Sequence, residues 1–233
     1  AIEYTLPYSE IPNFPVSTVQ GHQGALVFGT IQGKKVVAMQ GRFHFYEGYD
    51  MKQVTFPVRV MKYLGVEKLV VSNASGGVNP EYVIGDVVVI TDHINMMPEH
   101  PLRGHNDERF GPRFVNMSEP YSKAMIEKAF ELAKALNIDL KKGIYLGLQG
   151  PTFETLAEYK MVKALGADCV GMSTVPEVIV ARHMNMECFG VSVITDMGDE
   201  ENIEEVNHEE VLQAAQKAEP HVRNLIKNLI AQY

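Results

Sequence analysis

The sequence predicts a single α/β domain with a doubly wound or related sheet and a helix layer on each side. Short Val- and Ile-rich runs that are apolar on both faces are typical of buried strands. They alternate with longer segments of helical periodicity, which is typical of a sheet covered by helices. No Gly/Ser-rich or Pro-rich tract divides the 233 residues, a length that one hydrophobic core can still serve.

Seven runs have the composition of strands, at 25–31, 35–40, 68–72, 86–91, 143–148, 168–172 and 188–195. The first two flank Gln32-Gly33, a pair that predicts a hairpin. Helical periodicity covers 118–136, 154–165, 176–183 and 207–230. Asn207 is a suitable N-cap for the last helix, and Pro220 should kink or interrupt that helix. Segment 95–116 is longer than a loop that only connects two elements usually is, so we expect it to bind a ligand or another subunit.

The composition argues against several classes of protein. A net charge of -8, from 21 Lys+Arg against 29 Asp+Glu, argues against a broad nucleic-acid-binding face. Cys169 and Cys188 lack zinc or disulfide spacing, which predicts a reduced, cytoplasmic setting. No apolar run approaches the roughly 20 residues of a membrane span. Ala1 stands where an initiator Met would, and no basic-then-apolar leader follows, so we expect no secretion signal and a chain that is short at its front.

Arg42, His44 and Tyr46 occupy alternate positions in the string GRFHFYEGY, directly after a predicted strand. In an extended segment these three side chains point the same way. Arg offers a planar fork that suits phosphate, His offers a second donor, and Tyr can cover the adjacent part of a ligand. The alternative is a solvated turn with one surface Arg.

The small-residue string NASGG, at 73–77, also follows a predicted strand. Such a string can form a nest of backbone N–H groups that binds an anion or a planar base edge. The alternative is a plain turn with positive φ at Gly76 and Gly77. The string is neither a Walker loop nor a dinucleotide-binding fingerprint.

Two further strings place polar side chains at predicted helix starts. In GPTFETLAEY, Thr152 is a candidate cap. Glu154 beside Phe153 can accept hydrogen bonds from a purine N–H edge, or can serve only the helix dipole. In GMSTVPEV, Ser173 or Thr174 precedes a proline, and a hydroxyl at a helix N-terminus is a common phosphate site.

Asp196 ends a predicted strand, where an α/β sheet usually presents a ligand-facing side chain. His208 lies in the first turn of the last helix. The positive end of that helix disfavours the imidazolium, so a neutral His208 can donate to a substrate hydroxyl.

Nine strings occur in order along the chain: NFPVSTVQGH, GRFHFYEGY, NASGG, DHIN, HPLRG, NDERFG, GPTFET, GADCVGMSTVPEVIVARH and NHEEVL. Together they closely resemble the trimeric purine nucleoside phosphorylases, from about Ile11 into the last helix. The resemblance implies a three-layer α/β/α fold with a central mixed, mostly parallel sheet, in one domain over 1–233.

The resemblance also implies an activity. The implied reaction is reversible phosphorolysis of purine ribo- and deoxyribonucleosides, mainly inosine and guanosine, to the free base and (deoxy)ribose 1-phosphate in purine salvage. It implies a homotrimer with phosphate as co-substrate, no metal or other cofactor, and no nucleic-acid or membrane partner.

The family's site residues carry over onto matching positions of this sequence. Phosphate would be held by Arg42, His44, the Ala74 backbone, Ser173 and, near the phosphate loop, His22. The nucleoside would be bound by Tyr46, Asn73, Phe153, Glu154, Val170, Gly171, Met172, Asp196 and His208, with Phe114 reaching in from a neighbouring subunit. The catalytic roles would fall to His44, Glu154, Asp196 and His208, and no side-chain nucleophile is needed because phosphate attacks.

Two features depart from the family pattern. No counterpart of the family's Gly-Ser phosphate loop precedes the NFP segment, so we expect one wall of the phosphate site to be missing from the sequence as written. Asp196 stands where 6-oxopurine-specific members carry Asn. An ionised Asp only accepts, which suits a 6-amino group, whereas Glu154 suits the N1–H of a 6-oxopurine. We therefore expect Asp196 to be partly protonated in a complex with a 6-oxopurine, which costs about 4 kcal/mol unless burial or Glu154 raises its pKa.

Two alternative functions stay open. A methylthioadenosine phosphorylase would share the fold and the phosphate site and would match at Asp196, although Glu154 suits an oxopurine and His208 a 5′-hydroxyl. A catalytically inactive, purine-binding homologue is favoured by the missing Gly-Ser loop.

Overall fold

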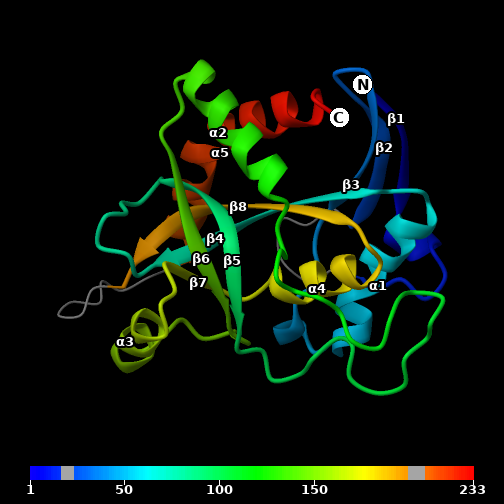
Figure 1. Cartoon of the computed structure of the whole chain (residues 1–233), viewed down its shortest axis with the longest axis horizontal. Helices are drawn as coiled ribbons and strands as arrows, with labels where there is room; N and C mark the ends of the chain where they lie inside the picture. The colour runs from blue at the N-terminus through cyan, green and yellow to red at the C-terminus, as the bar shows by residue number, and fades with distance from the viewer. Residues whose placement is uncertain (17–23, 199–207) are drawn as a thin grey trace.

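The computed structural model describes residues 1–16, 24–198 and 208–233, apart from the side chain of His208. Over this part of the chain there are two sheets and five α-helices (Figure 1). The strands are β1 (Ile2–Pro7), β2 (Ala25–Ile31), β3 (Lys34–Gln40), β4 (Lys68–Gly77), β5 (Val87–Asn95), β6 (Leu140–Gly147), β7 (Cys169–Gly171) and β8 (Glu187–Met197). The helices are α1 (Met51–Tyr63), α2 (Lys123–Leu136), α3 (Leu156–Ala164), α4 (Val175–His183) and α5 (His208–Ile230), with 3₁₀ turns at η1 (Tyr8–Glu10) and η2 (Phe45–Glu47).

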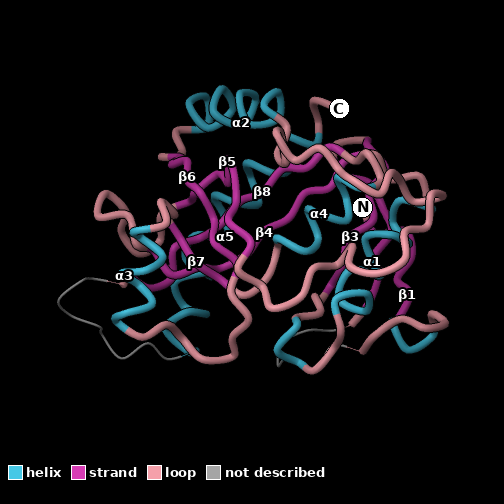
Figure 2. The backbone as a smooth tube through the Cα atoms, turned by 60° about the horizontal axis from the view of Figure 1, so that its bottom comes forward, coloured by secondary structure: helices cyan, strands magenta, loops and turns pink. Residues whose placement is uncertain are grey.

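The central sheet has the strand order β4-β7-β6-β5-β8 and closes on itself through β8 and β4. Three of its strand pairs are parallel (β4/β8, β5/β6, β6/β7) and two are antiparallel (β4/β7, β5/β8). A mixed, mostly parallel sheet is therefore confirmed, but it is closed and not open. Strands β1 to β3 form a separate antiparallel sheet beside it (Figure 2).

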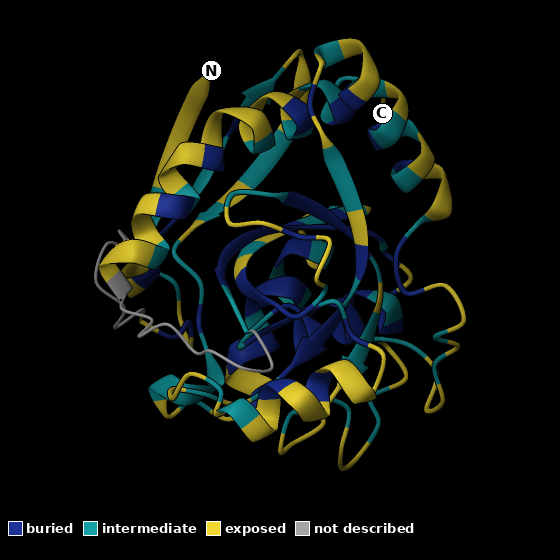
Figure 3. Ribbon diagram, turned by 90° about the vertical axis from the view of Figure 1, so that its left-hand side faces the viewer, coloured by how far each residue is buried: buried dark blue, intermediate teal, exposed yellow. Residues whose placement is uncertain are grey.

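Helices cover the central sheet on two sides, which confirms the three-layer α/β/α arrangement. Along β5, Val87 and Val89 pack in one apolar cluster with residues of α2 and α5. Val88 and Ile90 pack in another cluster with residues of α1 and α4. Because neighbouring strand residues point to opposite faces, a continuous apolar run serves both helix layers. The buried residues gather in the middle, with the exposed helix faces outside (Figure 3).

The predicted hairpin is confirmed, with Gln32 and Gly33 at φ 51° and 78° joining β2 to β3. Positive φ at both central residues is the preferred geometry of a two-residue hairpin turn. The segment after β5 is confirmed as a long connection to α2. Helix α2 begins later than predicted because Ser122 caps it. Pro220 lies inside an unbroken α5, and the predicted cap Asn207 lies outside the described residues.

Two elements were not predicted. Strand β1 is largely exposed and pairs only with β2, so it lacks a strong apolar signature. Helix α1 contains Pro57 and several β-branched residues, which weaken its helical signal. Its start was nevertheless readable, because Asp50 and Gln53 form a capping box. Among the described residues, none of the helices is both long and apolar enough to cross a membrane.

Candidate active site

Most of the predicted site residues meet in one cavity of about 1180 Å³. Its lining includes Arg42, His44, Tyr46, Asn73, Ala74, Phe153, Val170, Gly171, Met172, Ser173 and Asp196. The cavity continues as an apolar groove between β3, β4 and α5, so its volume exceeds that of one ligand site. Five of these residues lie on β4, β7 and β8, and the pairing of these strands brings the five together: Asn73, Ala74, Val170, Gly171 and Asp196.

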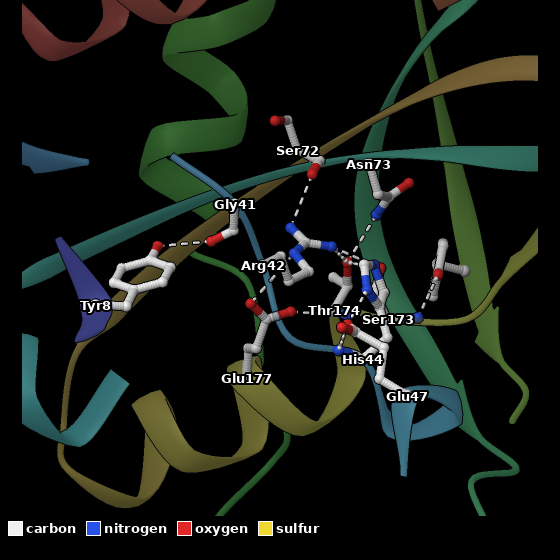
Figure 4. A network of polar contacts seen from close by, with 11 residues as sticks. Tyr8, Gly41, Arg42, His44, Glu47, Ser72, Asn73, Ser173, Thr174 and Glu177 are labelled. Atoms are coloured by element: carbon white, nitrogen blue, oxygen red, sulfur yellow. Dashed lines mark hydrogen bonds and ion pairs between the residues drawn. The ribbon is translucent and has the colours of Figure 1, made fainter. Parts of the chain in front are cut away.

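Arg42 is the cation at one end of this cavity (Figure 4). Its guanidinium donates to Oγ of Ser173 at 2.6 Å and to the carbonyl of Ser72 at 2.8 Å. Its Nε lies 3.5 Å from Oε1 of Glu177, on α4. Three partners from different elements hold the planar group in one orientation, which suits recognition of an oxyanion.

His44 and Tyr46 line the same end of the cavity, but not as one extended segment. Residue 44 is extended, whereas Tyr46 lies in the 3₁₀ turn η2, and the two rings stack with centroids 4.8 Å apart. The backbone N–H of His44 donates to Oε1 of Glu47 at 2.7 Å, and ring Nδ1 lies 3.0 Å from the same oxygen. Burial and the nearby Arg42 lower the pKa of His44, which favours the neutral ring.

The NASGG string is not a turn, and the expectation of positive φ at its glycines is wrong. Residues 73–77 continue strand β4 to Gly77 and pair with β8, with a shift of register between Ser75 and Gly76. Both glycines are needed for another reason. A Cβ on Gly76 would lie 2.8 Å from Oδ2 of Asp196, and one on Gly77 would lie 2.6 Å from Sδ of Met197. The small residues therefore make room for side chains of β8.

Thr174 connects the anion end to helix α4. It is fully buried and adopts φ 68°, ψ -53° as the N-cap of α4, a costly conformation for a β-branched residue. Its Oγ1 accepts from Nδ2 of Asn73 at 2.8 Å, and its N–H donates to Oε2 of Glu177 at 2.9 Å. The predicted helix start is confirmed, and the strained cap presents Ser173 to Arg42.

Asp196 marks the other end of the site. It lies on β8, is buried, and accepts from the Tyr159 hydroxyl at 3.1 Å and from the Thr195 hydroxyl at 2.9 Å. Burial raises the pKa of Asp196 and raises the pKa of Glu154 to about 7. The nearby Asp196 also raises the pKa of Glu154. Phe153 lines the cavity with 40% of its surface exposed.

Helix α3 begins after Glu154, so two expectations for this segment were wrong. Its N-cap is Thr155, in a capping box with Glu158, and not Thr152. Glu154 therefore precedes the cap and does not serve the first turn of the helix. On β7, a Cβ on Gly171 would collide with the hydroxyl of Tyr145, which explains the absence of a side chain there.

Known proteins share this arrangement. The model of the family described as the phosphorylase superfamily matches residues 1–231. The chain belongs to the phosphorylase superfamily.

Within the superfamily, the chain is 52% identical over 228 residues to purine nucleoside phosphorylase 1 of Bacillus subtilis (strain 168), covering 98% of this chain and 84% of that protein. Among solved structures, it matches a Schistosoma mansoni purine nucleoside phosphorylase in complex with inosine at a TM-score of 0.92 and 44% identity, covering 99% of this chain and 84% of that chain. A complex of the Schistosoma mansoni enzyme with adenosine matches at a TM-score of 0.91 and 44% identity, covering 98% and 83%. The family inferred from the nine ordered strings is confirmed.

Several predicted residues of this phosphorylase-superfamily chain are not brought to the cavity. Phe114 is 88% exposed and lies outside the cavity lining of its own chain. Glu154 is half-buried and is not among the lining residues, although it interacts with Tyr159 and Asp196. His22 and the side chain of His208 lie outside the described residues.

Four residues at the site had no predicted role, and a fifth, Thr174, was predicted only as an alternative to Ser173 for a phosphate-binding hydroxyl. The five are Glu47, Tyr145, Tyr159, Thr174 and Glu177. Two of them carried a readable signal, because Glu47 follows His44 and Glu177 follows Thr174 at capping-box spacing. Tyr145 and Tyr159 gave none, since their partners are remote in sequence. Over the described residues, no group of three or more His, Cys, Asp or Glu side chains is placed to hold a metal ion.

Proposed function

We propose that the chain catalyses reversible phosphorolysis of purine ribo- and deoxyribonucleosides, mainly inosine and guanosine. One observation carries the proposal: a single cavity has a cationic, hydroxyl-bearing end at Arg42 and Ser173 and an aromatic, carboxyl-bearing end at Phe153 and Asp196. The first end suits an oxyanion and the second a purine. The names of its relatives point to the same reaction.

At the anion end, the donors are arranged for phosphate. Ser173 accepts from Arg42, so its own hydroxyl proton can be donated to the neighbouring Thr174 hydroxyl or, when phosphate is bound, to a phosphate oxygen. An ionised Glu47 only accepts, so Nδ1 of His44 donates to it and Nε2 of the neutral ring carries no proton. Arrival of a phosphate dianion favours protonation of the ring, which turns Nε2 into a second donor.

The reaction then needs no nucleophile from the protein. An oxygen of the bound phosphate forms a bond to C1′ of the sugar, the C1′–N9 bond breaks, and its electron pair leaves with the purine. Positive charge on the sugar is stabilised by the adjacent phosphate, and fixed orientation of the attacking group lowers the barrier further. The departing base takes a proton at N7, where Asp196 or solvent can supply it. Burial of Asp196 reduces the cost of holding that proton.

The remaining assignments follow the family pattern and belong to the same proposal. Phosphate also contacts the Ala74 backbone and His22. The sugar contacts Tyr46, Met172 and His208, with Phe114 supplied by a neighbouring subunit of a homotrimer. Asn73, Val170 and Gly171 complete the nucleoside contacts, and Glu154 binds the N1 edge of the base.

We propose that phosphate is a co-substrate and that the enzyme uses no metal or other cofactor. A cytoplasmic setting, the purine-salvage role, the absence of nucleic-acid and membrane partners, and a single domain over 1–233 stay predictions.

One assay tests the proposal. Purified protein is offered inosine, guanosine, adenosine or methylthioadenosine, with and without phosphate, and free base and sugar 1-phosphate are quantified. We expect phosphate-dependent cleavage of inosine and guanosine. Arg42→Ala should raise the KM for phosphate at least tenfold. The matched control is Arg223→Ala, because Arg223 is exposed and pairs with Glu219 on its own helix.

Other outcomes would replace the proposal. Cleavage of methylthioadenosine without cleavage of inosine would identify a methylthioadenosine phosphorylase. Purine binding without any turnover would identify an inactive homologue. Cleavage that does not depend on phosphate would identify a hydrolase.

A further inference from the structure

Tyr159 places a single hydroxyl at the base end of the cavity. Its ring is buried in the apolar cluster under α3, with Leu146, Val162 and Val170. Gly198 lies so close that any side chain there would collide with the ring. The ring is therefore held from two sides, and its hydroxyl donates to Oδ2 of Asp196 at 3.1 Å.

We propose that Tyr159 is a positioning residue that sets the choice between 6-aminopurines and 6-oxopurines, because its hydroxyl keeps Asp196 a hydrogen-bond acceptor and so lets the site accept 6-aminopurine nucleosides. The inference rests on the proposed function and deepens it. Tyr159 acts through Asp196, so it is not assigned a contact with the substrate.

Asp196 receives donors on both oxygens, from Tyr159 on Oδ2 and from Thr195 on Oδ1. Hydrogen bonds donated to a carboxylate stabilise its ionised form. Burial acts in the opposite direction and raises the pKa of Asp196, so the two hydroxyls offset the effect of burial. From β4, the uncharged backbone of Gly76 lies against Oδ2. Glu154 is the charged neighbour whose pKa responds to Asp196.

The charge on Asp196 matters because the two purine classes present opposite edges. A 6-amino group donates, whereas a 6-oxo group accepts, and N1 accepts in the first class and carries a proton in the second. One proton shared by the two carboxyls fits either base. It lies on Glu154 for a 6-aminopurine and on Asp196 for a 6-oxopurine. Burial raises the pKa of Glu154 to about 7, so Glu154 can hold that proton near neutral pH. The hydrogen bond from Tyr159 to Asp196 favours the first arrangement. Tyr159 also lowers the pKa of Glu154, which acts in the opposite direction, but the hydroxyl is directed at Oδ2 of Asp196.

The experiment compares wild type, Tyr159→Phe, Asp196→Asn and the double variant. It measures kcat/KM for inosine and adenosine between about pH 5 and 9, and binding of hypoxanthine and adenine by calorimetry. The matched control is Tyr82→Phe, which removes another buried hydroxyl, one that donates to the carbonyl of Lys142 away from the site.

Tyr159→Phe should lower the ratio of kcat/KM for adenosine to that for inosine about tenfold, since it removes a hydrogen bond to a charged group. The acid limb of the adenosine profile should move up by about one pH unit, because Asp196 then protonates more readily. In the Asp196→Asn background, the same substitution should leave the ratio unchanged. Tyr82→Phe should leave it unchanged as well.

Three results would overturn the inference. An unchanged adenosine-to-inosine ratio in Tyr159→Phe, with active enzyme, would reject it while the proposed function stands. The same ratio change in the Asp196→Asn background would show that Tyr159 does not act through Asp196. Absence of any phosphorolysis by wild type would reject the proposed function and this inference together, unless adenine and hypoxanthine binding still shows the Tyr159-dependent preference.

Discussion

The buried hydroxyl of Thr174 offers a sharp test of how the anion end is built. Its Oγ1 accepts from Asn73 at 2.8 Å, and Arg42 at 3.5 Å adds little. Thr174→Val keeps the shape but removes the acceptor, leaving the Asn73 amide donor without this partner. Thr174→Val removes the hydrogen bonds with Asn73 and with Ser173, each worth about 1 kcal/mol, so we expect it to lower the free energy of unfolding by about 2 kcal/mol.

Thr174→Ser is the matched control because it keeps the hydroxyl and removes one methyl group. The lost methyl costs about 1 kcal/mol. Relief of a β-branched residue at φ 68° offsets part of this cost. We therefore expect a change within about 1 kcal/mol. For a chain of this length, the Thr174→Val value corresponds to a melting temperature lower by about 4–8 °C.

The assay pairs chemical unfolding with the KM for phosphate. Thr174→Val should raise that KM about three- to tenfold, because Asn73 and Ser173 lose a fixed neighbour. Equal unfolding midpoints and equal phosphate KM values for the two variants would refute the reasoning. The methyl group, and not the hydroxyl, would then be what matters at this position.

Three further predictions concern the base end and the subunit contact. Phe114→Ala should raise the KM for inosine several-fold without changing the free energy of unfolding, because the ring is 88% exposed; an unchanged KM would count against a shared site. Gly76→Ala places a Cβ 2.8 Å from Oδ2 of Asp196, so the nucleoside KM should rise and the free energy of unfolding should fall by about 2 kcal/mol. No change in either kinetics or chemical unfolding would mean that Asp196 moves freely. Burial raises the pKa of Glu154 from 4.5 to about 7, so the folded state keeps a proton that the unfolded chain releases. The free energy of unfolding should therefore fall by about 2–3 kcal/mol as pH rises from 4.5 to 7, and unfolding curves of Glu154→Gln should lack this loss.

The strand and helix pattern could be predicted where packing agrees with local signals. The runs that became β5 and β8 are apolar on both faces because helices cover both sides. Helix α1 escaped prediction because Pro57 and its β-branched residues give a weak local signal, which packing of Val58 and Met61 in the core overrides. Closure of the sheet was not predictable, since it depends on pairing between β4 and β8, which are remote in sequence.

The candidate site divides in the same way. Arg42 and Ser173 can be predicted as candidate phosphate ligands, because of their residue types and because each follows a predicted strand. The sequence indicates that positions 76 and 77 need glycine, but the reason is the close approach of β8 side chains and not a turn. That distance is set by sheet pairing, which no local string reports.

By itself, the sequence determined the family, the α/β class and the polar and aromatic residues at the two ends of the cavity, because ordered strings and strand ends are local features. Only the tertiary structure decided how these residues are held. It placed Glu177 against Arg42, Thr174 against Asn73, and Tyr159 on Asp196. Such contacts join residues that are far apart along the chain. Their distances and burial, and therefore the pKa of Asp196, exist only once the strands have paired and the helices have covered them.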